Sequence, residues 1–179
     1  TLGLSSCESF LSENPKDQIT EEQAYQNSTL LYLNTVASLY TQVGANGGGA
    51  GLQGTDRGLY DLNTFTTDEA MLPTRGGDWY DGGQYREIYM HTWTSQTSVI
   101  KGAWSTASEA IGTCNANLKV VESSDFLSDE QMSLYTSEIR GIRAFWIYKM
   151  MDDWGNIPLV TDYADKELPA CQPRQTVFD

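Results

Sequence analysis

Apolar residues recur at helical spacing in two long segments of the chain. One stripe, with members three or four positions apart, runs through residues 98–121 and consists of Ile100, Trp104, Ala107, Ile111, Cys114, Leu118 and Val121. A second stripe follows the capping-box pattern Ser128–Gln131 and consists of Met132, Tyr135, Ile139, Ile142, Trp146 and Met150. These patterns predict two long amphipathic helices, the second of which ends at Gly155.

A third helix is predicted near the start of the chain, between the capping box Thr20–Gln23 and Gly44. Its apolar residues form two adjacent stripes, so we expect it to pack on more than one side. These stripes are Leu30, Leu33, Ala37 and Tyr40, and Tyr32, Val36, Leu39 and Val43. Residues 157–160 read as a short edge strand, because Pro158 is tolerated only at an edge. The pattern as a whole predicts a mainly α fold.

Residues 55–97 show no clean period and are rich in aromatic residues, aspartate and glycine. A segment of this length without regular structure is typically functional, and its aromatic content argues against disorder. The block 67–83 combines Trp79 with carboxylates and Arg75, and Trp93 follows shortly after. Such mixtures bind neutral sugars, because aromatic faces stack on C–H groups while charged side chains pair with hydroxyls. The alternative is that each tryptophan packs into the core.

The same block also permits an enzyme. A glycoside hydrolase needs two carboxylates, and the block contains four acids, Asp68, Glu69, Asp78 and Asp81. Acids in loops are, however, more often solvated. With 24 acidic and 11 basic residues the net charge is −13, which disfavours nucleic acid as a partner. The chain has one histidine, His91, and no metal-binding or cofactor motif, so we expect neither a metal nor a cofactor.

The three cysteines have different surroundings in the sequence. Cys7 follows Leu4-Ser5-Ser6, which is similar to the end of a bacterial lipoprotein signal, where the cysteine becomes lipidated. The alternative is an ordinary surface cysteine near a frayed terminus. Cys114 lies on an apolar helical stripe and Cys171 in a proline-flanked loop, and the sequence leaves open whether these two pair or stay free.

Four stretches of the chain together form a recognisable pattern. They are Cys7-Glu8-Ser9-Phe10-Leu11, Glu138-Ile139-Arg140-Gly141-Ile142-Arg143-Ala144-Phe145-Trp146, Trp154-Gly155-Asn156-Ile157-Pro158-Leu159-Val160 and Arg174-Gln175-Thr176-Val177-Phe178-Asp179. In these stretches the chain resembles the SusD/RagB family of outer-membrane lipoproteins of Bacteroidetes. The resemblance spans nearly the whole chain, and its most specific part is the second long helix with its exit. It implies a helical SusD-like fold, with tetratricopeptide-like helix pairs as scaffold and long irregular segments at the ligand site.

The resemblance also implies a domain organisation. Residues 1–6 would be the tail of a signal peptide, and residues 7–19 an extended lead-in lipidated at Cys7. Residues 20–179 would be the N-terminal part of a longer helical domain. By matching positions, the glycan-binding residues would be Asp68, Arg75 and Trp93, with Trp79 and Asp81 in the same block. The residues after Trp93 are Thr94-Ser95-Gln96, so an asparagine that some relatives carry there is missing.

The leading functional hypothesis is therefore non-catalytic binding of oligo- or polysaccharides, such as starch, at the cell surface. The protein would be lipid-anchored in the outer membrane and deliver its glycan to a TonB-dependent transporter of the SusC type. One alternative is a glycoside hydrolase fragment that uses acids of residues 67–81. Another is a partner of the transporter that binds peptide or other cargo. The sequence does not specify the glycan or the oligomeric state.

Overall fold

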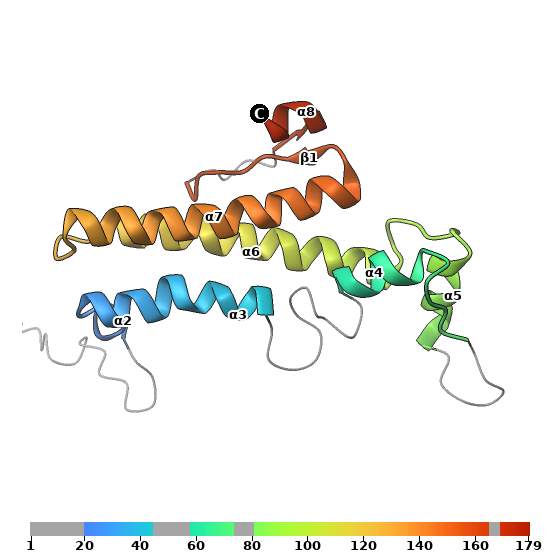
Figure 1. The fold of residues 1–179 in the computed structure, drawn as a ribbon, viewed down its shortest axis with the longest axis horizontal. Coiled ribbons are helices and arrows are strands. Elements are labelled where there is room, and N and C mark those ends of the chain that lie inside the picture. Colours follow the sequence, from blue (N-terminus) through green and yellow to red (C-terminus); the bar gives the residue numbers. More distant parts are fainter. Residues whose placement is uncertain (1–19, 45–57, 74–80, 165–168) are drawn as a thin grey trace, which may run out of the picture.

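The structure, a computed structural model, describes residues 20–44, 58–73, 81–164 and 169–179. The described chain is mainly helical, with two long helices side by side, shorter elements around them, and α5 beyond one end of the pair (Figure 1). The long helices are α6 (Ser98–Glu122) and α7 (Asp129–Trp154). The two long helices and the mainly α fold that the apolar stripes predicted are thus confirmed.

Helices α6 and α7 form an antiparallel hairpin that contains most of the hydrophobic core (Figure 1). Every member of the α7 stripe except Met132 is buried, and Trp146 is the largest fully buried side chain. On α6, Ile100 and Trp104 at the start are only partly buried, whereas the stripe from Ala107 onward is buried. The Ser128 hydroxyl oxygen accepts a hydrogen bond from the backbone N–H of Gln131, and Gln131 Oε1 accepts one from the backbone N–H of Ser128, so the predicted capping box begins α7.

The N-terminal helix is divided into shorter pieces. These are α1 (Glu21–Ala24), α2 (Ser28–Tyr32), the π-helix η2 (Leu33–Ala37) and α3 (Ser38–Gly44). The predicted capping box at Thr20 is present, but helix α1 stops after one turn and the chain starts again where Asn27 caps the N–H of Leu30. The π-turn frees the Thr35 carbonyl, which accepts hydrogen bonds from the Ser38 hydroxyl at 3.1 Å and from the Asn117 amide at 2.7 Å.

The π-turn also overturns part of the predicted apolar face. A constant α-helical period put Leu33 and Tyr40 in the core, but these side chains are 52% and 51% exposed. The buried residues are Leu31, Thr35, Val36 and Leu39. Because a π-turn holds more residues than an α-turn, it rotates the face that meets α6 and α7. Tyr40 instead donates its hydroxyl to Glu138 of α7, as Tyr32 does.

Two helices occur in the segment without a periodic pattern. Helix α4 (Leu59–Phe65) packs against α6, and α5 (Gln84–Tyr89) follows the 3₁₀ turn η3 (Asp81–Gly83). Both are too short to show a stripe, and their packing is fixed by buried Leu59, Leu62 and Ile88. The Tyr85 hydroxyl donates to the buried Asp61 carboxylate at 2.8 Å, which ties α5 to α4.

The chain after α7 forms a small antiparallel ladder and a last helix. Strand β1 (Ile157–Pro158) pairs with β2 (Cys171–Gln172), with Pro158 opposite Cys171, and α8 (Arg174–Phe178) follows. The predicted short strand is therefore present. Cys114 and Cys171 are both free thiols, the first buried and the second exposed. Burial raises the pKa of the Cys114 thiol to about 11.

No helix among the described residues is both long enough and apolar enough to cross a membrane. Within the same residues, no group of three or more histidine, cysteine, aspartate or glutamate side chains is placed to hold a metal ion.

Gly155 ends α7 with φ 73° and ψ −85°, a conformation that L-residues rarely adopt, although open space surrounds it. We expect Gly155→Ala to lower the free energy of unfolding by about 1–3 kcal/mol through backbone strain alone. Gly112 and Gly141 lie inside α6 and α7, also in open space but with ordinary φ. Alanine at either should instead stabilise by about 0.5–1 kcal/mol. Urea denaturation of the three variants measures this difference, and equal effects would contradict it.

Asn117→Ala should destabilise the protein, because it removes the buried donor to the π-turn carbonyl of Thr35. The expected cost is about 1–3 kcal/mol of unfolding free energy. Ser105→Ala, at an exposed position of the same helix, is the control and should stay within about 0.5 kcal/mol of the parent. Equal unfolding midpoints for the two variants would show that the Asn117 bond is dispensable.

Candidate ligand-binding site

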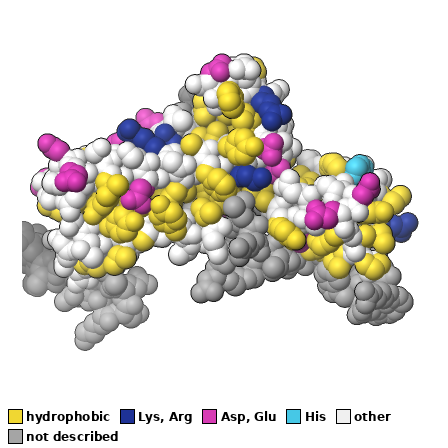
Figure 2. All heavy atoms as spheres, in the orientation of Figure 1, with side chains coloured by type: hydrophobic (Ala, Val, Ile, Leu, Met, Phe, Trp, Pro, Cys, Tyr) yellow, Lys and Arg dark blue, Asp and Glu magenta, His cyan; other side chains and the backbone are white. Residues whose placement is uncertain are grey.

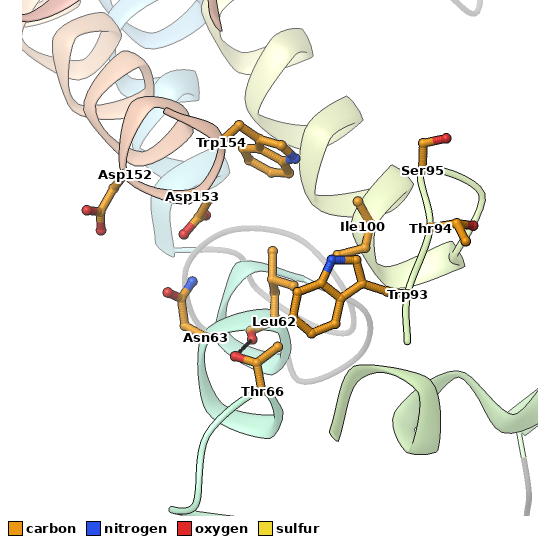
Figure 3. A pocket seen from close by; sticks show the side chains of 10 residues that line it. All are labelled: Leu62, Asn63, Thr66, Trp93, Thr94, Ser95, Ile100, Asp152, Asp153 and Trp154. Atoms are coloured by element: carbon orange, nitrogen blue, oxygen red, sulfur yellow. Dashed lines mark hydrogen bonds between the residues drawn. The ribbon is translucent and has the colours of Figure 1, made fainter. Parts of the chain in front are cut away.

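A well-formed cavity opens where three parts of the fold meet. Helix α4, the loop before α6 and the C-terminal end of α7 enclose about 530 Å³. Its lining residues are Leu62, Asn63, Thr66, Trp93, Thr94, Ser95, Ile100, Asp152, Asp153 and Trp154 (Figure 3). Two indole rings and several hydroxyl, amide and carboxylate groups therefore share one cavity that has the size of a small-ligand site.

Trp93 presents an accessible aromatic face at this cavity. Its side chain is 39% exposed, and its ring centroid lies 5.1 Å from that of His91. His91 has φ 56°, a left-handed conformation that is uncommon outside glycine. Its Nε2 lies 2.7 Å from the Thr66 carbonyl oxygen, so this nitrogen carries the proton and donates to α4. This bond ties the loop that carries Trp93 to the end of α4 and keeps His91 in its uncommon backbone conformation.

The remainder of the loop is also fixed by hydrogen bonds. The Thr97 hydroxyl donates to the Glu87 carboxylate of α5 at 3.0 Å and accepts from the backbone N–H of Thr94 at 3.0 Å. Thr92 N–H donates to the Glu87 carbonyl at 3.0 Å. A loop held in this way orders its aromatic side chain before a ligand arrives, which lowers the entropic cost of binding.

On the α7 side of the cavity, Trp154 and Asp153 form the wall opposite Trp93 (Figure 3). Trp154 packs edge-on against Trp104 of α6, with ring centroids 5.2 Å apart. Asp153 is half-buried, and its Oδ2 has no hydrogen-bond partner within the described part of the chain. Burial raises the pKa of the Asp153 carboxyl above its ordinary value of 3.8, while Lys149 and the Asn63 amide oppose this only partly.

The structure brings together few of the residues that the sequence suggested. Trp93 lines the cavity, whereas Asp68 lies exposed in the turn after α4 and does not. Arg75, Trp79 and Cys7 lie outside the described residues. Asp81 begins the 3₁₀ turn before α5, and its side chain also lies outside the description.

Sequence reasoning did not select the acids that do line the cavity. Asp152 and Asp153 fall near the predicted end of the second long helix, and Asp152 makes ion pairs with Lys149 at 4.0 Å and Arg174 at 3.7 Å. Asn63 lies on α4 and Thr66 follows its last residue, and the sequence of this short helix shows no apolar stripe. One feature of the sequence points to these acids as cavity residues. Asp152-Asp153-Trp154 stands directly before Gly155, and polar residues at the end of a helix lie where the chain turns into a loop.

No protein-family model matches this chain, and no curated protein matches its sequence. Two solved structures have a similar fold. Surface glycan-binding protein A from Bacteroides uniformis superposes with a TM-score of 0.63 at 14% identity, over 86% of this chain and 31% of that one. Surface glycan-binding protein A from Bacteroides fluxus gives 0.55 at 16% identity, over 90% of this chain and 31% of that one. The chain thus spans about a third of either neighbour, and the likeness establishes a shared mainly helical fold.

Asp153→Asn should stabilise the protein at neutral pH. A raised carboxyl pKa means that the folded state binds the proton more tightly than the unfolded state does. The stability of the parent should therefore fall as pH rises above about 3.8 through the raised pKa, and remain lower beyond it. Thermal unfolding between pH 3 and 8 should show this decline in the parent and a flatter profile in Asp153→Asn. A variant less stable than the parent at pH 7 would contradict the assignment.

Proposed function

We propose that this chain captures glycans without catalysis, as the N-terminal part of a longer SusD/RagB-like protein. The observation that carries the proposal is the exposed Trp93 indole, held by a fixed loop at the edge of a polar cavity. A pyranose ring would stack on this indole, while its hydroxyls pair with Asn63, Thr66 and the Asp153 wall. The fold shared with two surface glycan-binding proteins of Bacteroides supports this choice of ligand.

We further propose the cellular setting that the sequence resemblance implies. Cys7 would carry a lipid anchor on the outer face of the outer membrane. Arg75, Trp79, Asp68 and Asp81 would extend the site around Trp93. The captured glycan would then pass to a TonB-dependent transporter of the SusC type. The acidic surface, with its net charge of −13, fits attachment by a lipid and not by basic patches.

A transporter-facing role for part of the surface is the second candidate. Seven residues around α5 enclose an apolar groove of about 330 Å³: Met71, Leu72, Pro73, Tyr85, Arg86, Tyr89 and Met90. Met71 and Met90 are exposed there, and methionine-rich surfaces adapt to protein partners. This role predicts co-purification with the transporter and no binding of a soluble glycan.

Native affinity electrophoresis tests glycan capture. The full-length protein should be retarded by gels that contain one or a few of a panel of polysaccharides. Trp93→Ala should weaken that retardation about tenfold or more, because a stacking face is lost. Trp93→Phe should keep part of it. Tyr148→Ala, which removes an exposed aromatic side chain from α7 outside the cavity, is the matched control and should bind like the parent.

Three results would count against this proposal. Absence of retardation by every polysaccharide would favour the peptide-cargo and transporter-partner hypotheses. Equal retardation of parent and Trp93→Ala would leave glycan binding intact but exclude Trp93 as its stacking residue. Release of shorter saccharides from the retarding polysaccharide, abolished by Asp68→Asn or Asp81→Asn, would establish the hydrolase alternative.

A further inference from the structure

A second polar cavity lies beside the last turns of α6 and the middle of α7. It encloses about 460 Å³ between these two helices and the segment after β1. Its lining residues are Asn115, Leu118, Lys119, Glu122, Arg140, Arg143, Thr161, Asp162, Tyr163 and Ala164. Lys119 and Ile100 of the first cavity are 19 residues apart on one helix, which corresponds to about 28 Å. The two cavities are therefore separate sites.

The charge of this cavity is opposite to that of the chain. Three of the 11 basic side chains line it, against two acids, in a protein with a net charge of −13. Both acids already have partners. Glu122 pairs with Arg140 at 3.0 Å, and the Asp162 carboxylate accepts the backbone N–H of Ala164 at 2.8 Å. Lys119 and Arg143 have no anionic partner within the described residues.

Arg143 is held in a geometry that leaves one edge of its guanidinium unused. Its Nη1 donates to Asn115 Oδ1 at 2.7 Å and to the Thr161 carbonyl at 2.8 Å. Within the described part of the chain, Nε and Nη2 have no hydrogen-bond acceptor. These two groups share one edge, and they form the parallel pair of donors that a carboxylate accepts. Partial burial lowers the pKa of Arg143, and the positive charge of Arg140 adds to this, whereas Cys114 and Glu122 oppose it.

Tyr163 adds an aromatic surface beside these cations. The Lys119 ammonium lies 5.4 Å from the Tyr163 ring centroid, and the ring is exposed. A sugar ring fits a cavity of this size, with one edge held by charge and its C–H groups near an aromatic ring. We propose that this cavity binds the carboxylate of an acidic sugar, with Arg143 as the bidentate donor and Lys119 as a second cation.

The proposed ligand differs in charge from one suited to the first cavity, whose charged lining residues are Asp152 and Asp153. A glycan that carries both neutral and acidic sugars would contact the two cavities through different residues. The choice of a sugar as the ligand rests on the proposed glycan capture, whereas the carboxylate is argued from Arg143 and Lys119 alone.

Saturation-transfer NMR of the full-length protein tests this site with D-glucuronate, D-glucose and acetate as probes. We expect glucuronate to bind more tightly than acetate, and glucose to give no transfer that depends on Arg143 or Lys119. Binding of glucuronate should weaken as salt is added. Lys119→Ala should weaken it about two- to fivefold, because this ammonium is exposed. Arg143→Lys should weaken it about tenfold or more, because the bidentate pair is lost.

Two control variants separate this site from other sources of binding. Lys101→Ala removes the same exposed charge from the other end of α6 and should leave glucuronate binding unchanged. Trp93→Ala should also leave it unchanged, because Trp93 belongs to the first cavity. Arg143→Lys disturbs the bonds to Asn115 and Thr161 and could prevent folding. Lys119→Ala is expected to fold normally, so it tests the site independently of Arg143→Lys.

The outcomes that overturn the proposal are distinct. Equal affinity for glucose and glucuronate would exclude a carboxylate site, and equal affinity for acetate and glucuronate would exclude the sugar. Unchanged glucuronate binding in Lys119→Ala, or its loss in Trp93→Ala, would place the ligand outside this cavity. Failure of general glycan capture would be seen separately, as absence of retardation in the polysaccharide gels.

Discussion

Helices α6 and α7 pack along almost their full length, and both cavities depend on this contact. The buried faces of the two helices meet through large side chains, above all Trp146, Ile139 and Ile111. The cavity with Trp93 lies at the start of α6 and the end of α7, and the cavity with Arg143 lies beside the last turns of α6 and the middle of α7. On the face of the molecule drawn in Figure 2, apolar, acidic and basic side chains are interspersed on the surface. A change that separated the two helices would therefore remove both sites.

Polar side chains of α6 and α7 form hydrogen bonds to the elements that surround the hairpin. The Asn117 amide reaches the π-turn at Thr35, and Glu138 accepts hydroxyl protons from two tyrosines of the N-terminal helices. Asn115 and Arg143 hold the backbone at Val160 and Thr161. The Asn117 bond is buried and the Asn115 bond is part-buried, so both satisfy polar groups whose burial would otherwise cost free energy. The same bonds leave only one edge of Arg143 unused.

Much of the fold could be predicted because its signals are local. Helix α7 begins at Ser128, which contacts Gln131 only three residues away, and it ends at a glycine with positive φ. The stripes of α6 and α7 follow from a constant period. The predicted burial of Leu33 and Tyr40 was wrong, because a π-turn rotates the buried face of this helix. The carbonyl of Thr35 in that turn is bonded by Asn117, which lies 82 residues away in the chain, so no local pattern indicates it. Prediction also missed α4 and α5, which are shorter than two helical periods and depend on packing against other elements.

The sequence by itself determined which segments become long helices, since capping and periodicity act within a few residues. It also selected Trp93, through its place in an aromatic segment and through a family resemblance. Only the tertiary structure decided what surrounds that indole. Asn63 and Asp153 lie 30 and 60 residues from Trp93, and folding alone places them in one cavity. Burial likewise gave Asp153 its raised pKa. A side chain's chemistry is encoded in its residue type, but its neighbours and its solvation follow from the packing of distant elements.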